Sequence, residues 1–166
     1  MMQPDTKNQS NPEPAAEEDA VYVFPASFAQ ERLWFLDQFE PGSPYYNIPC
    51  AVRLRGRLDT GALQRALNEI VRRHEALRTT FGARAGQPVQ IIAPTLSLPL
   101  AITDLSHHPE PERDAQAARL AELEARRPFH LDRGPLLRAS LLRLADDEHV
   151  ALLTLHHIVA DGWSMG

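Results

Sequence analysis

Residues 136–157 read LLRASLLRLADDEHVALLTLHH, two apolar runs joined by a short polar segment. The first run ends at Leu144, the polar residues ADDE follow, and the second run starts at His149. The pattern predicts a β-hairpin, because two strand-like runs flank a short polar connection. The second run is apolar at nearly every position, which is typical of a central strand with both faces covered.

The segments that precede this hairpin also carry regular patterns. Ser27 can cap a helix together with Gln30, and the apolar residues that follow lie nearly all around the helix axis. We therefore expect this helix to be buried. Residues 48–54 alternate between apolar and other residues, which predicts a half-buried strand with Cys50 on its core side.

Two more helices are predicted between these segments and the hairpin. Asp59 offers an N-cap, and apolar residues continue at helical spacing, so we expect one helix over 60–81. A second helix, rich in Ala, Glu and Arg, is expected over 111–127, after short apolar runs at 89–93 and 98–103. Strands and helices in mixed order predict an α/β fold in which a sheet packs against helices.

The composition limits the classes of function. A chain of 166 residues with 43% hydrophobic content can bury one core. A net charge of −5 lacks the basic excess of a nucleic-acid-binding surface. The apolar runs are shorter than the ~20 residues that cross a bilayer, and a lone Cys50 cannot build a disulfide framework. We expect a cytoplasmic protein with neither nucleic acid nor membrane as a partner.

The chain divides into two parts. Residues 1–20 are rich in Pro, Gln, Asn and acidic residues and have few apolar ones, so they are expected to form a disordered leader or linker. They show no signal-peptide pattern. The folded domain is expected over 21–166.

The last apolar run is followed by a group of residues that can carry chemistry: His156, His157, Asp161 and Gly162. Neighbouring side chains of a strand point to opposite faces, so the two histidines do not readily bind one metal ion, and no metal site is expected. An imidazole at the mouth of a cleft can take a proton from an amine or alcohol nucleophile. The alternative is that both histidines pack in the core.

Arg78 is a second candidate, because it falls inside the apolar stripe of the helix expected over 60–81. A buried guanidinium needs a carboxylate partner or must extend to solvent. Asp161 is one candidate partner and Glu75 is a competing one; a solvated cation at the helix end is the third possibility. Paired with Arg78, Asp161 would hold the loop so that His157 faces a substrate.

Three stretches, in order, resemble motifs of the condensation domains of nonribosomal peptide synthetases. They are SFAQERLWFL (27–36), RHEALRTTF (73–81) and HHIVADGWS (156–164), the last of which is the HHxxxDG signature. The stretch PFHLDRGPLLRASLLRL (128–144) is similar to the family's segment upstream of that signature. The first motif resembles most the branch that joins an L-configured donor to an L-configured acceptor.

The resemblance implies a fold like chloramphenicol acetyltransferase, with a mixed, mostly antiparallel sheet packed with helices in each of two lobes that form a V. Family members join an upstream aminoacyl or peptidyl thioester to the amine of a downstream aminoacyl thioester. Both substrates are carried on phosphopantetheine arms of partner carrier proteins, so no directly bound cofactor is expected. Adjacent synthetase domains are the other partners that the resemblance implies.

The resemblance also implies roles for individual residues. His157, the second histidine of the signature, would deprotonate or orient the attacking amine, and the N–H of Gly162 would lie near the thioester. Structural support of the site is implied for His156, Asp161, Arg78 and Arg73.

The chain departs from the family in length, since it ends just after the HHxxxDG signature and before the second lobe. We expect it to represent the N-terminal lobe, to expose an apolar face where the lobes would meet, and to be inactive without the second lobe. Three alternatives stay open: a related acyltransferase that uses coenzyme A or carrier-bound acyl groups, an epimerising relative, and a non-catalytic module that docks on carrier proteins or neighbouring domains.

Overall fold

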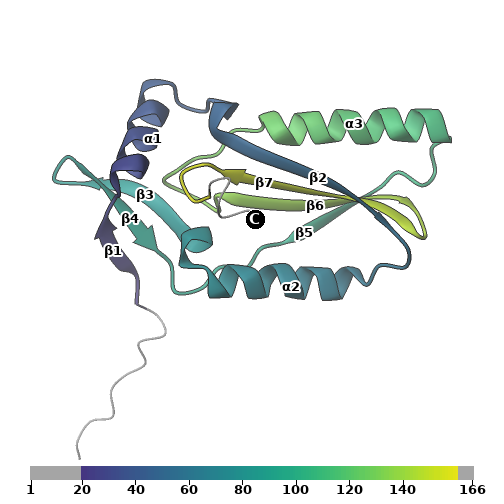
Figure 1. Cartoon of the computed structure of the whole chain (residues 1–166), viewed down its shortest axis with the longest axis horizontal. Coiled ribbons are helices and arrows are strands. Elements are labelled where there is room, and N and C mark those ends of the chain that lie inside the picture. Colours follow the sequence, from purple (N-terminus) through teal and green to yellow (C-terminus); the bar gives the residue numbers. More distant parts are fainter. Residues whose placement is uncertain (1–19, 161–166) are drawn as a thin grey trace, which may run out of the picture.

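The computed structural model describes residues 20–160, which form two β-sheets and three α-helices (Figure 1). The larger sheet has the strand order β2 (Asn47–Arg55), β7 (Glu148–His156), β6 (Leu137–Ala145) and β5 (Leu100–Asp104). The smaller sheet has the order β1 (Tyr22–Pro25), β4 (Gln87–Ile92) and β3 (Thr79–Arg84). The helices are α1 (Phe28–Phe39), α2 (Thr60–Arg73) and α3 (Glu110–Arg126), with short 3-10 helices η2 (Pro44–Tyr46) and η3 (Glu75–Arg78).

The predicted hairpin is confirmed as β6 and β7. The two strands pair antiparallel, with Leu137 opposite Leu155 and Leu141 opposite Ala151. β7 lies in the middle of the larger sheet because β2 pairs with its other edge, also antiparallel. β5 is the exception to the antiparallel pattern and pairs parallel to β6.

Helices α2 and α3 cover opposite faces of the larger sheet (Figure 1). Val71 of α2 belongs to a buried cluster with Leu137 and Leu155, whereas Ala117 of α3 packs with Leu142 and Leu152. Odd-numbered and even-numbered residues of β6 and β7 therefore serve different faces, as strand geometry requires. This arrangement explains the nearly unbroken apolar run of β7.

A third cluster lies where the two sheets meet α1. Its buried members are Phe81, Phe129, Leu131, Leu136 and Ile158, and Leu33 and Trp34 of α1 pack against it. Phe81 comes from β3, whereas Ile158 follows the end of β7. The cluster thus supports the turn after β7, where the sequence places the candidate histidines.

The helix expected over 60–81 is wrong in its last part. Asp59 caps α2 as expected, its side chain accepting a hydrogen bond from the N–H of Ala62, but α2 ends at Arg73. Residues 75–78 form η3, and β3 begins at Thr79. Two consecutive threonines and Phe81 favour a strand, and pairing with β4 outweighs the helical periodicity.

The expected burial of the first helix is also wrong. The capping box is present, with Ser27 and Gln30 each bonding the other's backbone N–H. However, α1 has no buried residue, and Phe28 and Phe39 are 91% and 81% exposed. The described chain covers only the side of α1 that carries Leu33 and Trp34, so an all-round apolar helix keeps its other side in solvent.

The expected strand over 48–54 is confirmed as β2, and Cys50 is half-buried, as its alternation predicts. Val52, on the same face, is exposed. The expected helix over 111–127 is α3. No helix within 20–160 is long and apolar enough to cross a membrane. The leader expected over 1–20 lies almost wholly outside the described residues, as do Asp161 and Gly162.

Candidate functional site

The two histidines lie where β7 ends and turns. His156 is the last residue of the strand, and its N–H donates to the carbonyl of Leu136 at 3.0 Å. The next N–H, that of His157, donates to the carbonyl of Tyr46 at 2.8 Å. The His156–His157 peptide is therefore held from both neighbouring segments, at the point where the second strand of the expected hairpin ends.

His156 is a buried residue, with only 3% of its surface exposed. Its Nδ1 accepts a hydrogen bond from the N–H of Ile158 at 3.1 Å, which places the proton of the neutral ring on Nε2. The ring of Phe129 meets it edge to face at 6.0 Å, and the ring of Tyr46 lies 6.2 Å away.

The environment of His156 disfavours its charged form. Burial, and to a smaller extent the nearby His157, lower the pKa of His156 to about 4. The ring is consequently neutral near pH 7 and presents no charge to a ligand. This residue supports the turn and is unsuited to general-base catalysis in the described geometry.

His157 has the opposite surroundings. It is exposed and lines a cavity of about 490 Å³ together with residues of α1, with Tyr46 and with the turn after β7. The α1 residues in this wall are Ala29, Gln30, Arg32, Leu33 and Leu36. The core-packing alternative thus holds for His156 and fails for His157, which has open space beside it.

Arg78 is nearly buried, with 12% of its side chain exposed. Its Nη2 lies 3.3 Å from Oε1 of Glu75, and its Nη1 donates to the carbonyl of Ala93. Its Nε has no hydrogen-bond partner among residues 20–160. The interpretation as a solvated cation is therefore wrong, and Glu75 is one carboxylate partner; the second candidate, Asp161, lies outside the described residues.

Arg73, by contrast, makes no hydrogen bond or ion pair with Arg78 or the histidines in the described part of the chain. Its guanidinium is exposed and bonds Glu69 at 2.8 Å, one turn back along α2. Hydrogen bonds from Arg72 and Arg73 lower the pKa of Glu69 to about 2. Arg73 therefore stabilises the last turn of α2.

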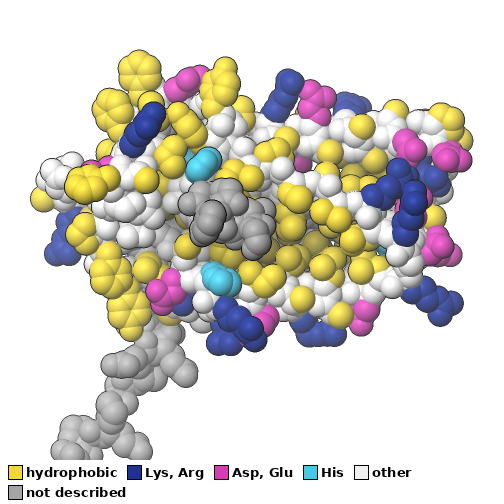
Figure 2. All heavy atoms as spheres, in the orientation of Figure 1, with side chains coloured by type: hydrophobic (Ala, Val, Ile, Leu, Met, Phe, Trp, Pro, Cys, Tyr) yellow, Lys and Arg dark blue, Asp and Glu magenta, His cyan; other side chains and the backbone are white. Residues whose placement is uncertain are grey.

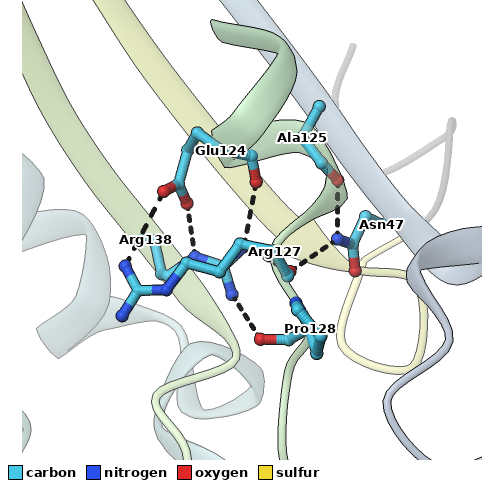
Figure 3. A network of polar contacts seen from close by, with 6 residues as sticks. All are labelled: Asn47, Glu124, Ala125, Arg127, Pro128 and Arg138. Carbon is cyan, nitrogen blue, oxygen red and sulfur yellow. Dashed lines mark hydrogen bonds and ion pairs between the residues drawn. The ribbon is translucent and has the colours of Figure 1, made fainter. Parts of the chain in front are cut away.

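Sequence reasoning missed the residues that surround the histidines, above all Tyr46, Asn47 and Arg138. Figure 3 shows that Asn47 and Arg138 converge on the C-terminal end of α3, where Glu124 also lies. One signal for Arg138 was present, because a charged residue inside a covered apolar strand requires partners.

Metal binding finds no support in the part of the chain that is described. No group of three His, Cys, Asp or Glu side chains within 20–160 is arranged to hold a metal ion. His156 already uses Nδ1 to accept a backbone hydrogen bond.

The family of the chain follows from its sequence as a whole. A profile of the condensation domain matches residues 21–166, so the chain belongs to the condensation domain family. A linear gramicidin synthase from Brevibacillus parabrevis is 58% identical over 141 residues, which are 85% of this chain and 2% of that protein. Chondramide synthase of Chondromyces crocatus is 54% identical over 144 residues, 87% of this chain and 4% of that protein.

Solved structures agree on the fold. The first condensation domain of the CDA synthetase superposes with a TM-score of 0.77 at 28% identity, covering 87% of this chain and 36% of that chain. The starter condensation domain of rhizomide synthetase gives a TM-score of 0.75 at 28% identity, with 86% and 35% covered. The expected α/β, chloramphenicol-acetyltransferase-like fold is confirmed, and the chain spans about a third of those structures.

Proposed function

We propose that the chain is the N-terminal lobe of a peptide-bond-forming condensation domain. Its donor is an aminoacyl or peptidyl thioester on one carrier protein, and its acceptor is the amine of an aminoacyl thioester on another. The amine nitrogen attacks the thioester carbonyl, a C–N bond forms, the C–S bond breaks, the donor thiol leaves and the amine loses a proton. A phosphinothricin tripeptide synthetase of Streptomyces viridochromogenes, 52% identical over 142 residues, carries peptide synthesis in its name and supports this reaction class.

One observation carries the proposal: exposed His157 faces a cavity, and its neighbour His156 is buried and held neutral. A histidine that is fixed through its backbone but free at its ring can accept a proton from an amine or orient its lone pair. The hydrogen bond from His157 N–H to Tyr46 supplies this fixation.

The residues after the described turn complete the proposed site. Asp161 is the structural acid and Arg78 its partner; the buried Nε of Arg78, which has no partner within 20–160, supports this pairing. The N–H of Gly162 donates a hydrogen bond to the thioester oxygen and stabilises the negative charge that develops on it. Arg73 acts indirectly by holding the end of α2, which η3 and Arg78 follow.

The other wall of the active site belongs to a second lobe in this proposal. The exposed phenyl groups of α1 and the exposed residues of β1 form an apolar surface of the kind that two lobes bury when they meet (Figure 2). Without that lobe, water reaches the site from the open side, so the chain alone is proposed to be inactive.

The test uses the chain extended by the rest of its condensation domain, with two loaded carrier proteins. Carrier-bound product is followed by mass spectrometry. We expect His157→Ala to lower the transfer rate by a factor on the order of 100 or more, whereas His107→Ala, which changes an exposed histidine elsewhere, leaves it unchanged. Equal transfer by wild type and His157→Ala would remove His157 from the mechanism.

The same assay separates the alternatives. Transfer from an acyl-coenzyme A donor, with no transfer from a carrier-bound donor, would favour the related acyltransferase. Inversion of a single loaded substrate, without dipeptide, would favour the epimerising relative. Binding of carrier proteins with no product would favour a docking module.

A further inference from the structure

The C-terminal end of α3 is held by a side chain from the adjacent sheet. Arg138 of β6, 15% exposed, pairs with the carboxylate of Glu124 through Nε. Its Nη1 donates to the carbonyl of Pro128 at 3.1 Å, and its Nη2 donates to the carbonyls of Arg127 at 2.8 Å and Glu124 at 3.2 Å (Figure 3). Arg138 thus donates hydrogen bonds to one carbonyl in the last turn of α3, that of Glu124, and to the carbonyls of Arg127 and Pro128 directly after the helix.

A second strand reaches the same helix end. The side-chain amide of Asn47, the first residue of β2, donates to the carbonyls of Ala125 at 2.8 Å and Arg127 at 2.9 Å. Arg127 therefore accepts hydrogen bonds from both strands through one carbonyl oxygen. Residues 124–128, Arg138 and Asn47 form one unit, which we call the α3 brace.

The α3 brace reaches the histidines along two routes. The guanidinium carbon of Arg138 lies 3.7 Å from the ring centre of Phe129, and the same ring meets the ring of His156 edge to face. Asn47 pairs with His156 across the strands and follows Tyr46, whose carbonyl accepts the N–H of His157. One route ends on the ring of His156, and the other ends on the backbone of His157.

We propose that Arg138 and Asn47 are positioning residues, which anchor the end of α3 so that Phe129 and Tyr46 fix the ring of His156 and the backbone of His157. The consequence for catalysis rests on the proposed function; the effect on the histidines does not. Neither residue touches the cavity that His157 lines. Both act through a neighbour, as the outer residues around a catalytic group do when they set its orientation.

The geometry requires arginine and not merely a positive charge. The guanidinium serves a carboxylate and three carbonyl oxygens and also stacks on the Phe129 ring. A lysine ammonium keeps the attraction to Glu124 but lacks the planar fork and the flat face. Arg138→Lys therefore releases Phe129 while conserving the charge.

The matched control lies on the same strand. Arg143, near the other end of β6, pairs with Asp104 and Asp146, and its Cα pairs with His149 and not with His156. Arg143→Lys makes the same chemical change far from the site. Asn47→Ala is the second test variant, because it removes the other route without changing any charge.

The first readout is the ¹⁵N NMR spectrum of the His156 ring in the 166-residue chain. The wild type should show one tautomer, with Nε2 protonated and Nδ1 an acceptor. We expect Arg138→Lys and Asn47→Ala to shift these signals towards an average of the two tautomers, and Arg143→Lys to leave them in place. Circular dichroism and thermal unfolding verify that each variant is folded.

The second readout is kinetic and uses the extended domain. We expect Arg138→Lys to lower kcat about tenfold with an unchanged KM for the acceptor carrier protein, because the fault lies in geometry and not in binding. If His157→Ala proves fully active, the proposed catalytic role of His157 fails, but the NMR result still decides the positioning role. Wild-type ring signals in both test variants, with only a lower stability, would show a purely structural brace and overturn the inference.

Discussion

At the scale of single residues, the two adjacent histidines at the end of β7 have different roles, because their side chains point in opposite directions. His156 points into the protein, where the N–H of Ile158 and two aromatic rings surround it. His157 follows by one residue and faces a cavity. Since neighbouring side chains at a strand end point in opposite directions, the same backbone segment supplies both a structural anchor and an exposed imidazole.

The depressed pKa of His156 predicts a loss of stability in acid. The folded state holds this pKa near 4, against an ordinary value of 6.5, so the unfolded chain binds more protons between these values. The contribution of His156 to the free energy of unfolding is therefore fully present above about pH 6.5. It decreases as the pH falls towards 4, by about 3 kcal/mol in total. Urea denaturation at about pH 7.5 and about pH 4.5 measures the difference.

The His156→Asn variant tests whether this group is the source. The amide oxygen of asparagine can take the place of Nδ1 as the acceptor for Ile158, but it does not titrate. We expect the stability difference between the two pH values to shrink in His156→Asn and to persist in His107→Asn, which alters an exposed histidine. An unchanged difference in His156→Asn would assign the acid sensitivity to other groups.

At the scale of elements, local sequence patterns predicted most helices and strands. They did not predict the features that depend on contacts between distant parts of the chain. Asp59 and Ser27 cap their helices as their sequence patterns indicate, and the hairpin of β6 and β7 follows from two apolar runs. The helical spacing that continues past Arg73 misled the prediction, because β3 exists through its pairing with β4. The α3 brace was equally hidden, since Asn47 and Arg138 meet α3 from distant parts of the sequence.

The cap of α2 supports a prediction at this scale. Oδ1 of Asp59 accepts from the N–H of Ala62 at 2.8 Å, and α2 buries Val71 in the core. We expect Asp59→Ala to lower the free energy of unfolding by about 1 kcal/mol. The control, Asp147→Ala, removes an equally acidic and exposed side chain in the turn between β6 and β7 and should change stability by less than ~0.5 kcal/mol. Equal effects of the two substitutions, by urea denaturation, would argue against the cap.

At the scale of the whole molecule, burial is uneven. Three buried clusters hold α2, α3 and the turn after β7 to the sheets. By contrast, large apolar side chains of α1 and β1 face solvent on one part of the surface (Figure 2). Phe28, Phe35 and Phe39 are spaced so that they share one face of α1. Their exposure adds apolar surface without adding to the stability of the described fold.

This surface should bind a hydrophobic dye and promote self-association of the folded chain. We expect the combined substitution of Phe28, Phe35 and Phe39 by Gln to reduce the fluorescence of bound anilinonaphthalene sulfonate and the self-association seen by analytical ultracentrifugation. The free energy of unfolding should change little, by about 0.5 kcal/mol or less for each site, because the three side chains are exposed. Leu123→Gln, at an exposed position on α3, is the control and should leave both signals unchanged. If the triple variant instead unfolds at much lower urea concentration, these phenyl groups belong to the core of the chain, and the apolar face proposed to meet a second lobe does not exist.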